Sequence, residues 1–277
     1  MKFADLHIHS IFSDGTFDIN QILSLCKSKG LSCIAICDHD TVGGVEIALN
    51  LASKFEMEVI PCVELTCEYQ SREIHLLGYF VDYKDEQFLK IIDELQEYRK
   101  QRVFHIVEKL NKLGVNIQSQ EIFDQNPFPN ISWGRLHIAN TLVRKGVVSS
   151  YKEAFRKFIG EKGPAYVSRF KFSPFRGIQI LKEAKALPVL AHPLKSKCED
   201  LIPELIEAGL EGIEVFYPQH PLHIQNYYIQ IAHKYGVLIT GGSDCHGFAK
   251  KEVFIGRVKL PYSYVEKMKN RYAEIFS

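Results

Sequence analysis

The sequence predicts an α/β protein, built as a β/α barrel with a helical insertion. Over about the first eighty residues, short apolar runs alternate with segments of helical spacing, which is typical of βαβ units and a parallel sheet. The alternation stops at a long charged stretch and resumes in the second half, for about seven β/α units in all. This count favours a closed barrel, and the open doubly wound sheet is the alternative.

The elements of the first half follow from local patterns. In "KFADLHIHS", Asp5, His7 and His9 share one face of an extended strand. The next segment has apolar residues at helical spacing from Ile19 to Cys26 and ends at Gly30. "LSCIAIC" is typical of a strand that is buried on both faces. A helix over about residues 43–55 and the strands "EVIPCVEL" and "REIHLLGYF" follow.

The second half begins with the predicted insertion. We expect one long amphipathic helix over about residues 85–113, with further helices near 137–146 and 150–159. The alternation then resumes with the strands "PVLAH", "GIEVFY" and "VLITGGSD", each preceded by a helix, near 174–186, 199–208 and 222–235 respectively; a final helix ends the chain. The predicted barrel therefore comprises residues 1–82 and 161–277, and residues 83–160 form a helical insertion that caps the active site.

Composition excludes several classes of protein. The 277 residues are 46% hydrophobic and 24% charged, which argues against disorder, and no apolar run is long enough to span a bilayer. The first residues lack the pattern of a secretion signal, so we expect a cytoplasmic protein without a membrane anchor. A net charge of +1 gives no general attraction to duplex DNA. The seven cysteines contain no C-x-x-C pair and are expected to be buried free thiols.

Histidines and carboxylates gather in or just after the predicted strands. In parallel α/β folds the carboxyl ends of the strands meet at one rim, so these side chains should converge. One such histidine alone would be explained as a hydrogen-bonded core residue, but independent core histidines have no reason to share a rim. The candidates are His7, His9, Asp14, His39, Glu64, His75, His192, Asp244 and His246.

This set of residue types indicates a metal centre. Six imidazoles and three carboxylates without a thiolate suit Zn, Mn or Fe. They are too many for one ion and suit two or three ions around a bridging carboxylate such as Glu64. Such a cluster lowers the pKa of a bound water and holds the oxygens of a phosphoryl group during in-line displacement. The expected reaction is metal-assisted hydrolysis of a phosphate ester.

The chain resembles the PHP (polymerase and histidinol phosphatase) family of metal-dependent phosphoesterases. The resemblance is carried, in order, by "DLHIHSIFSDG", "CDHDTVGG", "CVEL", "EIHLLGY", "AHP" and "GGSDCHG", and it covers essentially the whole chain. It implies a distorted (β/α)7 barrel. It also implies that all nine candidate residues are ligands and that a metal-bound hydroxide, held by Glu64 and neighbouring ligands, is the nucleophile.

Trinuclear members of the family suggest how the ligands are divided among the ions. His7, His9 and Asp244 would hold one ion, and His75 and His192 a second, with Glu64 bridging these two. The third ion would be held by Asp14, His39 and His246. Manganese is the metal that we expect, and iron or zinc are the alternatives.

The insertion resembles that of nucleoside 3′,5′-bisphosphate phosphatases and of enzymes that trim RNA 5′ ends. In that group, the segments written here as "SWGRLHIANTLVRKGVV" and "GEKGPAYVSR" supply substrate contacts. Arg135 is the first candidate, because a guanidinium at the start of a helix suits a phosphate dianion. His137, Lys162, Arg169 and His220 are further candidates, with a solvated surface charge as the alternative for the first three and a helix-capping or surface role for His220.

The resulting hypothesis is a phosphatase for the 3′-phosphate of nucleoside 3′,5′-bisphosphates, with possible exonuclease action on short RNA. The alternatives are phosphatase action on histidinol phosphate, a sugar phosphate or a cyclic phosphate, and a non-catalytic barrel that binds metal or nucleotide.

We expect Asp5 to support the ligands from deeper in the barrel. Of Asp38 and Asp40, one is expected to orient the His39 ring and the other to be a turn residue or to cap the helix that starts near Gly43. The oligomeric state is left open.

Overall fold

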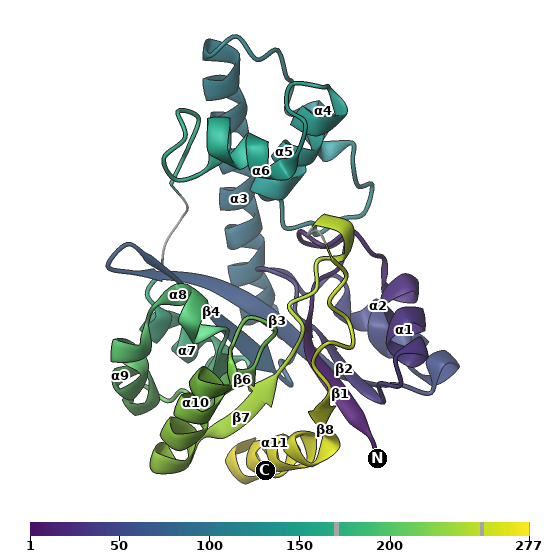
Figure 1. The fold of residues 1–277 in the computed structure, drawn as a ribbon, viewed down its shortest axis with the longest axis vertical. Coiled ribbons are helices and arrows are strands. Elements are labelled where there is room, and N and C mark those ends of the chain that lie inside the picture. Colours follow the sequence, from purple (N-terminus) through teal and green to yellow (C-terminus); the bar gives the residue numbers. More distant parts are fainter. Residues whose placement is uncertain (169–171, 250–251, 277) are drawn as a thin grey trace.

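The computed structural model describes residues 1–168, 172–249 and 252–276, and it shows a single eight-stranded sheet curved into a nearly closed barrel (Figure 1). The strand order is β7-β6-β5-β4-β3-β2-β1-β8. The strands are β1 (Phe3–Ile8), β2 (Cys33–Ile36), β3 (Glu58–Tyr69), β4 (Arg72–Tyr79), β5 (Leu187–Leu190), β6 (Gly212–Phe216), β7 (Leu238–Gly241) and β8 (Leu260–Pro261). The predicted α/β barrel is thus confirmed.

Backbone contacts next to β7 close the barrel against β1. The Asp244 N–H donates to the His7 carbonyl at 2.8 Å, and the His9 N–H donates to the Cys245 carbonyl at 3.0 Å. Both segments carry predicted ligands. The contacts that close the barrel therefore also bring the first ligand motif of the chain next to the last one.

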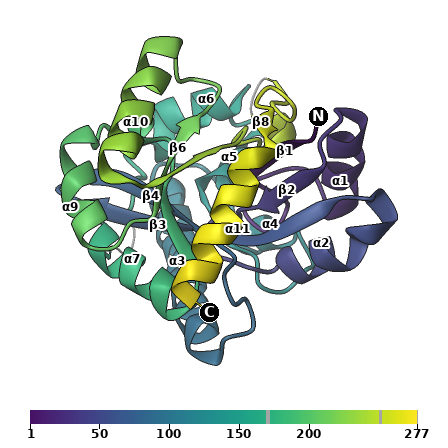
Figure 2. The ribbon, with the colours of Figure 1, turned by 90° about the horizontal axis from the view of Figure 1, so that it is seen from below.

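Helices cover the outside and both ends of the barrel. They are α1 (Ile19–Ser28), α2 (Val45–Leu51), α3 (Glu86–Lys112), α4 (Gln120–Phe123), α5 (Arg135–Arg144), α6 (Tyr151–Ala154), α7 (Pro174–Glu183), α8 (Pro193–Ser196), α9 (Ile202–Glu207), α10 (Leu222–Tyr235) and α11 (Tyr262–Phe276). Helices α3 to α6 rise from one end, and α11 crosses the opposite end (Figures 1 and 2). No helix in the described ranges combines the length and hydropathy that a membrane span requires.

Local signals explain the helix boundaries well. Helix α1 begins with a capping box, in which the Asp18 carboxylate accepts from the Gln21 N–H at 2.8 Å and the Gln21 side chain accepts from the Asp18 N–H at 2.9 Å. It ends before Gly30, whose φ of 75° is costly for a residue with a side chain. The predicted long helix is α3, which the Asp85 side chain caps. All seven cysteines are buried and free, as expected.

The prediction of a parallel sheet is wrong at β4 and β8. Strand β4 is antiparallel to both β3 and β5, and β8 is antiparallel to β1. Only Gln70 and Ser71 separate β3 from β4, both with positive φ, of 48° and 64°. Such a turn joins antiparallel strands, whereas a parallel connection needs a crossover of a dozen residues or more. Strand β3 also continues to Tyr69, so Glu64 lies inside it and not at its end.

The insertion has its own apolar core. Val103, Ile106 and Leu110 of α3 pack with buried residues of α4 to α6 in a cluster separate from those of the barrel. This cluster includes Ala165, so the packing of the insertion extends beyond the boundary expected at residue 160. The far half of α3 is therefore buried by its neighbours in the insertion, and not by the sheet.

An ion pair joins the base of α3 to the barrel. The Arg99 Nε donates to Asp40 Oδ2 at 2.7 Å, and Arg99 also donates to the Thr66 hydroxyl at 3.0 Å. The other Asp40 oxygen accepts from the Thr66 N–H at 2.8 Å, and Asp40 is almost fully buried. Asp40 does not cap α2, whose N-cap Gly44 provides no side-chain cap; it is instead a turn residue with a φ of 49°.

Replacing Arg99 should destabilise the fold. Arg99→Ala leaves the buried Asp40 carboxylate without its cation, and we expect the free energy of unfolding to fall by about 3 kcal/mol. Urea unfolding followed by circular dichroism measures this loss. Lys112→Ala is the control, because it removes an exposed Lys112–Glu108 pair at the far end of the same helix and should leave stability unchanged. Equal stability of the two variants would contradict this role for Arg99.

Candidate metal centre

The end of β1 is shaped so that two imidazoles project into the barrel. His7 and His9 share one face of the strand and are both buried. The Asp5 carboxylate, on the same face, accepts from the Ser243 N–H at 2.8 Å and so holds the segment that follows β7 against β1. Burial raises the Asp5 pKa to about 7. This is the supporting role that was expected of Asp5.

A glycine permits that close approach. A Cβ atom on Gly242 would lie 2.3 Å from the Cβ of His7, a distance at which one of the two segments must move. Gly242 therefore lets the chain after β7 pass over the base of His7.

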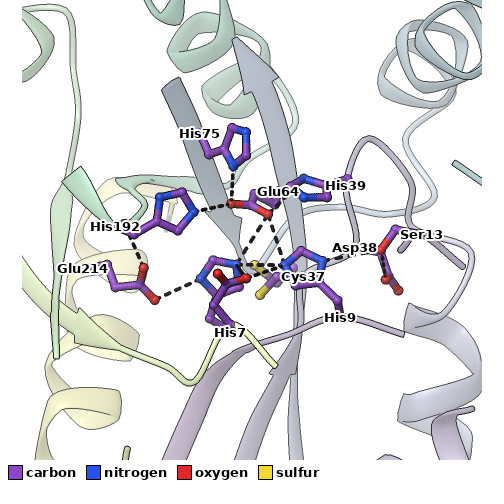
Figure 3. A network of polar contacts seen from close by, with 12 residues as sticks. His7, His9, Ser13, Cys37, Asp38, His39, Glu64, His75, His192 and Glu214 are labelled. Atoms are coloured by element: carbon purple, nitrogen blue, oxygen red, sulfur yellow. Dashed lines mark hydrogen bonds and ion pairs between the residues drawn. The ribbon is translucent and has the colours of Figure 1, made fainter. Parts of the chain in front are cut away.

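One buried carboxylate lies at the centre of the site (Figure 3). Glu64 is fully buried inside β3, and imidazoles of five histidines surround it. Its Oε1 lies 2.9 Å from His75 Nδ1 and 3.1 Å from His192 Nε2. Its Oε2 lies 3.0 Å from His39 Nδ1, 3.2 Å from His9 Nε2 and 3.4 Å from His7 Nε2. Glu64 thus occupies the position expected of a bridging carboxylate.

A second group lies beside the first, around Asp14 on the loop after β1. Asp14 Oδ1 is 3.2 Å from His246 Nε2 and 3.7 Å from His9 Nδ1, and Asp14 Oδ2 is 3.9 Å from His39 Nε2. Asp244 Oδ1 is 3.2 Å from His9 Nε2 and joins the two groups. The structure therefore brings all nine predicted ligand residues into one continuous cluster.

Four buried polar atoms of the cluster make no well-aligned hydrogen bond in the described ranges, although three of them lie close to atoms of other predicted ligands: Asp14 Oδ1, His39 Nδ1, Glu64 Oε2 and His192 Nδ1. Buried polar atoms without partners cost free energy, and convergent nitrogen and oxygen donors are what a divalent ion requires. The donor atoms of His9, Asp14, His39 and His246 lie within 4.8 Å of one another, as do those of the sets His7–His9–Glu64 and His39–Glu64–His75. The residues therefore fit a metal centre.

These overlapping sets differ in detail from the expected division among three ions. His9 belongs to two sets, and so does His39, which lies close to both Glu64 and Asp14. His39 follows β2 and lies between the other ligand segments, so its two ring nitrogens face different carboxylates. The division of ligands among the ions remains a prediction.

The predicted ligands differ in protonation state. Burial raises the pKa of Glu64, but the imidazoles of His39, His75 and His7 outweigh it and hold that pKa well below its usual value. Burial lowers the pKa of His39 to about 4 and that of His192 to about 3, so both rings are neutral at pH 7. Burial also lowers the pKa of His9 and of His75, but the nearby carboxylates raise each to about 9. Metal binding must therefore displace protons.

Glu214 is a site residue that the sequence analysis missed. It is fully buried in β6, its Oε1 lies 2.9 Å from His7 Nδ1, and its Oε2 accepts from the His192 N–H at 2.8 Å. A carboxylate on the far nitrogen of a ligand imidazole sets the tautomer and orientation of the ring. The available signal was one glutamate within the apolar strand "GIEVF".

Asp38 supports a different part of the site from the one expected. Its carboxylate accepts from the Ser10 N–H at 2.7 Å and from the hydroxyls of Ser10 and Ser13, both at 2.5 Å, and so shapes the loop that carries Asp14. In the described ranges neither Asp38 nor Asp40 bonds the His39 ring, which corrects the expectation that one of them would.

Tyr217 and Lys195 also lie at the cluster and were not predicted. The Tyr217 hydroxyl donates to Asp244 Oδ2 at 2.9 Å, and the Lys195 ammonium lies 3.7 Å from the same oxygen. The Lys195 side chain is 49% exposed, whereas Asp244 is buried. Its signal was the position three residues after His192 in "AHPLK".

The predicted substrate residues are placed differently from one another. His137 lies near the cluster: its Nδ1 accepts from the Gly134 N–H at 3.1 Å, and it lines a cavity together with Asp14. The Arg135 guanidinium lies over the rings of Phe155 and Tyr166, 5.3 and 5.7 Å from their centroids, within the packing of the insertion. A phosphate-binding role for Arg135 therefore remains a prediction.

The other three candidates have less support. Lys162 is exposed on the insertion. His220 is buried against Tyr217 and Tyr228, and its Nδ1 lies 2.9 Å from the Val215 carbonyl, which contradicts the surface role that was its alternative. Arg169 lies outside the described residues.

Glu214→Gln tests whether the Glu214 carboxylate orients the His7 imidazole for metal binding. The amide keeps the size of the side chain but removes the charge that orients the His7 ring, and we expect metal affinity to fall roughly 10- to 100-fold with the fold retained. Competition with a chromophoric chelator measures the affinity. Glu211→Gln is the control, because Glu211 lies just before the same strand and is buried against Arg271 outside the cluster. Unchanged metal affinity in Glu214→Gln would show that Glu214 only fills space.

Comparisons with known proteins agree with this site. The model of the PHP domain matches residues 5–155. A phosphoribosyl 1,2-cyclic phosphate 1,2-diphosphodiesterase of Eggerthella lenta is 26% identical over 88% of this chain and 94% of its own length. A 3′,5′-nucleoside bisphosphate phosphatase of Chromobacterium violaceum is 27% identical over 89% of this chain and 88% of its own. The 5′-3′ exoribonuclease Rnm of Escherichia coli is 25% identical over 87% and 84%, respectively.

Solved structures show the same fold. A Bifidobacterium adolescentis protein assigned to the metal-dependent phosphoesterases superposes with a TM-score of 0.90 at 26% identity, over 98% of this chain and 96% of its own. A Chromobacterium violaceum amidohydrolase, with bound sulfate and no metal, gives 0.83 at 25% identity, over 97% and 96%. With the clustered ligands and the matching domain, these similarities confirm the resemblance seen in the motifs, and the chain belongs to the PHP family of metal-dependent phosphoesterases.

Proposed function

We propose that this chain removes the 3′-phosphate of nucleoside 3′,5′-bisphosphates, with two or three divalent ions held by the nine clustered residues. The observation that carries the proposal is the convergence of buried ligand atoms around Glu64 and Asp14, several of which make no well-aligned hydrogen bond in the described ranges. The similarity to the Chromobacterium violaceum bisphosphate phosphatase over nearly its full length supports this choice of substrate.

Each part of the cluster has a distinct task in this proposal. The ions, when bound, lower the pKa of a water and neutralise the phosphoryl oxygens. Glu64 lies at the centre of the five histidines that surround it. Glu214 keeps the His7 ring in the orientation that binds metal. Manganese suits this mixture of imidazole and carboxylate ligands, and iron and zinc are the alternatives.

The reaction adds water across an ester bond. The water oxygen bonds to phosphorus, the bond from phosphorus to the ester oxygen breaks, and the departing alkoxide takes up a proton. Lys195 is the half-exposed cation beside Asp244, and we assign it to the non-bridging oxygens of the reacting phosphate, because a charged donor stabilises the negative charge that develops there.

Two other substrates have specific support. The relative of Eggerthella lenta, a phosphoribosyl cyclic phosphate diphosphodiesterase, matches over 94% of its own length, so a cyclic phosphodiester is the second candidate. The exoribonuclease of Escherichia coli makes the 5′ end of short RNA the third. All three reactions break a phosphorus–oxygen bond by hydrolysis and can use the same cluster.

A panel of substrates separates these functions. Protein loaded with Mn²⁺ is offered adenosine 3′,5′-bisphosphate, short 5′-phosphorylated RNA, phosphoribosyl 1,2-cyclic phosphate and histidinol phosphate, and products are identified by chromatography. We expect the highest kcat/KM with the bisphosphate, with AMP and phosphate as products. Glu64→Gln should lose both bound metal and turnover, whereas Glu58→Gln, at the start of the same strand, should keep both. Phosphate release from histidinol phosphate alone would refute the proposal.

Lys195→Met tests the role of the ammonium in catalysis. Removing one charged donor to the phosphate should lower kcat/KM roughly 10- to 100-fold. Metal content, measured by atomic emission, should stay the same, because Lys195 is not a metal ligand. Lys197→Met makes the same substitution two residues away on the exposed side of the turn and serves as the control. Equal activities of the two variants would remove Lys195 from the mechanism.

A further inference from the structure

A cavity of about 250 Å³ lies beside the metal cluster, between the barrel and the insertion. Its barrel wall is the loop after β1, which includes Asp14, and its other wall is one face of α5. Gly15 is required in this loop, because a Cβ atom there would lie 2.6 Å from the His9 carbonyl oxygen. The cavity therefore adjoins the Asp14 end of the cluster.

Helix α5 presents a polar stripe to this cavity. His137, Asn140 and Arg144 line it, and their spacing of three and four residues places them on one face of the helix. The Asn140 amide is held in place on both sides: its Nδ2 donates to Gln125 Oε1 at 2.7 Å, and its Oδ1 accepts from the Tyr151 hydroxyl at 3.1 Å. The wall is thus ordered before any ligand arrives.

Arg144 is the cation among the residues that line this cavity, and its guanidinium forms no hydrogen bond or ion pair with any residue in the described ranges. Its neighbour Lys145 differs, because its ammonium lies 2.7 Å from a Glu121 carboxylate oxygen and points to the outside of the insertion. The carboxylate of Asp14, across the cavity, contacts His246 at 3.2 Å as part of the cluster. A planar guanidinium with all its donors available is suited to bind a phosphate with two hydrogen bonds.

We propose that this cavity binds the second phosphate of the substrate, the one that is not hydrolysed, and that Arg144 is its anchor. The inference rests on the proposed function, since it places the reacting phosphate at the cluster and the other phosphate beyond Asp14. The Arg144 guanidinium binds the phosphate oxygens, and Asn140 supplies a fixed amide next to them. Arg144 therefore sets the preference for a substrate with two phosphates over a substrate with one phosphate.

Arg144→Ala tests the anchor with two substrates that share the same reacting bond. Adenosine 3′,5′-bisphosphate carries the second phosphate, and adenosine 3′-monophosphate lacks it. We expect kcat/KM for the bisphosphate to fall roughly 10- to 100-fold, mainly through KM, while the value for the monophosphate stays the same. Arg144→Lys should recover part of the loss, and Lys145→Ala should behave as wild type with both substrates.

A binding measurement gives a second readout that does not depend on turnover. Calorimetry with 5′-AMP, which carries only the phosphate that is not hydrolysed, should show weaker binding to Arg144→Ala than to Lys145→Ala, both loaded with Mn²⁺. Adenosine should show no difference between them. An equal loss on both substrates, or unchanged binding of 5′-AMP, would overturn the role of Arg144. Failure of the wild type to hydrolyse the bisphosphate, with 5′-AMP binding still dependent on Arg144, would instead reject the proposed function.

Discussion

The buried carboxylate of Glu64 is the group on which the rest of the site depends. A full negative charge inside a barrel is costly unless cations or strong donors surround it, and here five imidazoles from four different strands and loops do so. Removing the Glu64 carboxylate would leave the imidazoles without their partner, and removing the imidazoles would leave the carboxylate without its own. Glu64 and the histidines around it therefore stabilise one another, and their ligand atoms converge as a divalent ion requires.

The antiparallel hairpin of β3 and β4 is what makes this arrangement possible. His75 pairs with Thr66 across the hairpin, two residues along the strand from Glu64, so the carboxylate and the imidazole are diagonal neighbours on the inner face. A crossover helix between the two strands would make them parallel and separate these residues in register. The departure from a regular β/α barrel is thus located where two of the ligands meet.

The insertion contributes to the site from above the rim. Its base is fixed to the barrel through the Arg99–Asp40 pair, next to His39, and its helix α5 places His137 beside Asp14. The outer half has a core of its own, so its surface can differ without disturbing the cluster. The barrel thus carries the clustered histidines and carboxylates, and the insertion adds a wall beside them through α5.

The sequence by itself determined the residues whose positions depend on local spacing. His7 and His9 share a face because strands alternate with a period of two, and the capping box of Asp18 and Gln21 sets the start of α1. Which strands pair, and in which direction, was decided only by the tertiary structure. So was the place of Glu214, because a single carboxylate in an apolar strand has no local pattern, and its contact with His7 joins residues 207 positions apart. The spacing of side chains along one strand or helix is a property of the covalent chain. Which residues from distant segments come into contact depends on how the whole barrel closes.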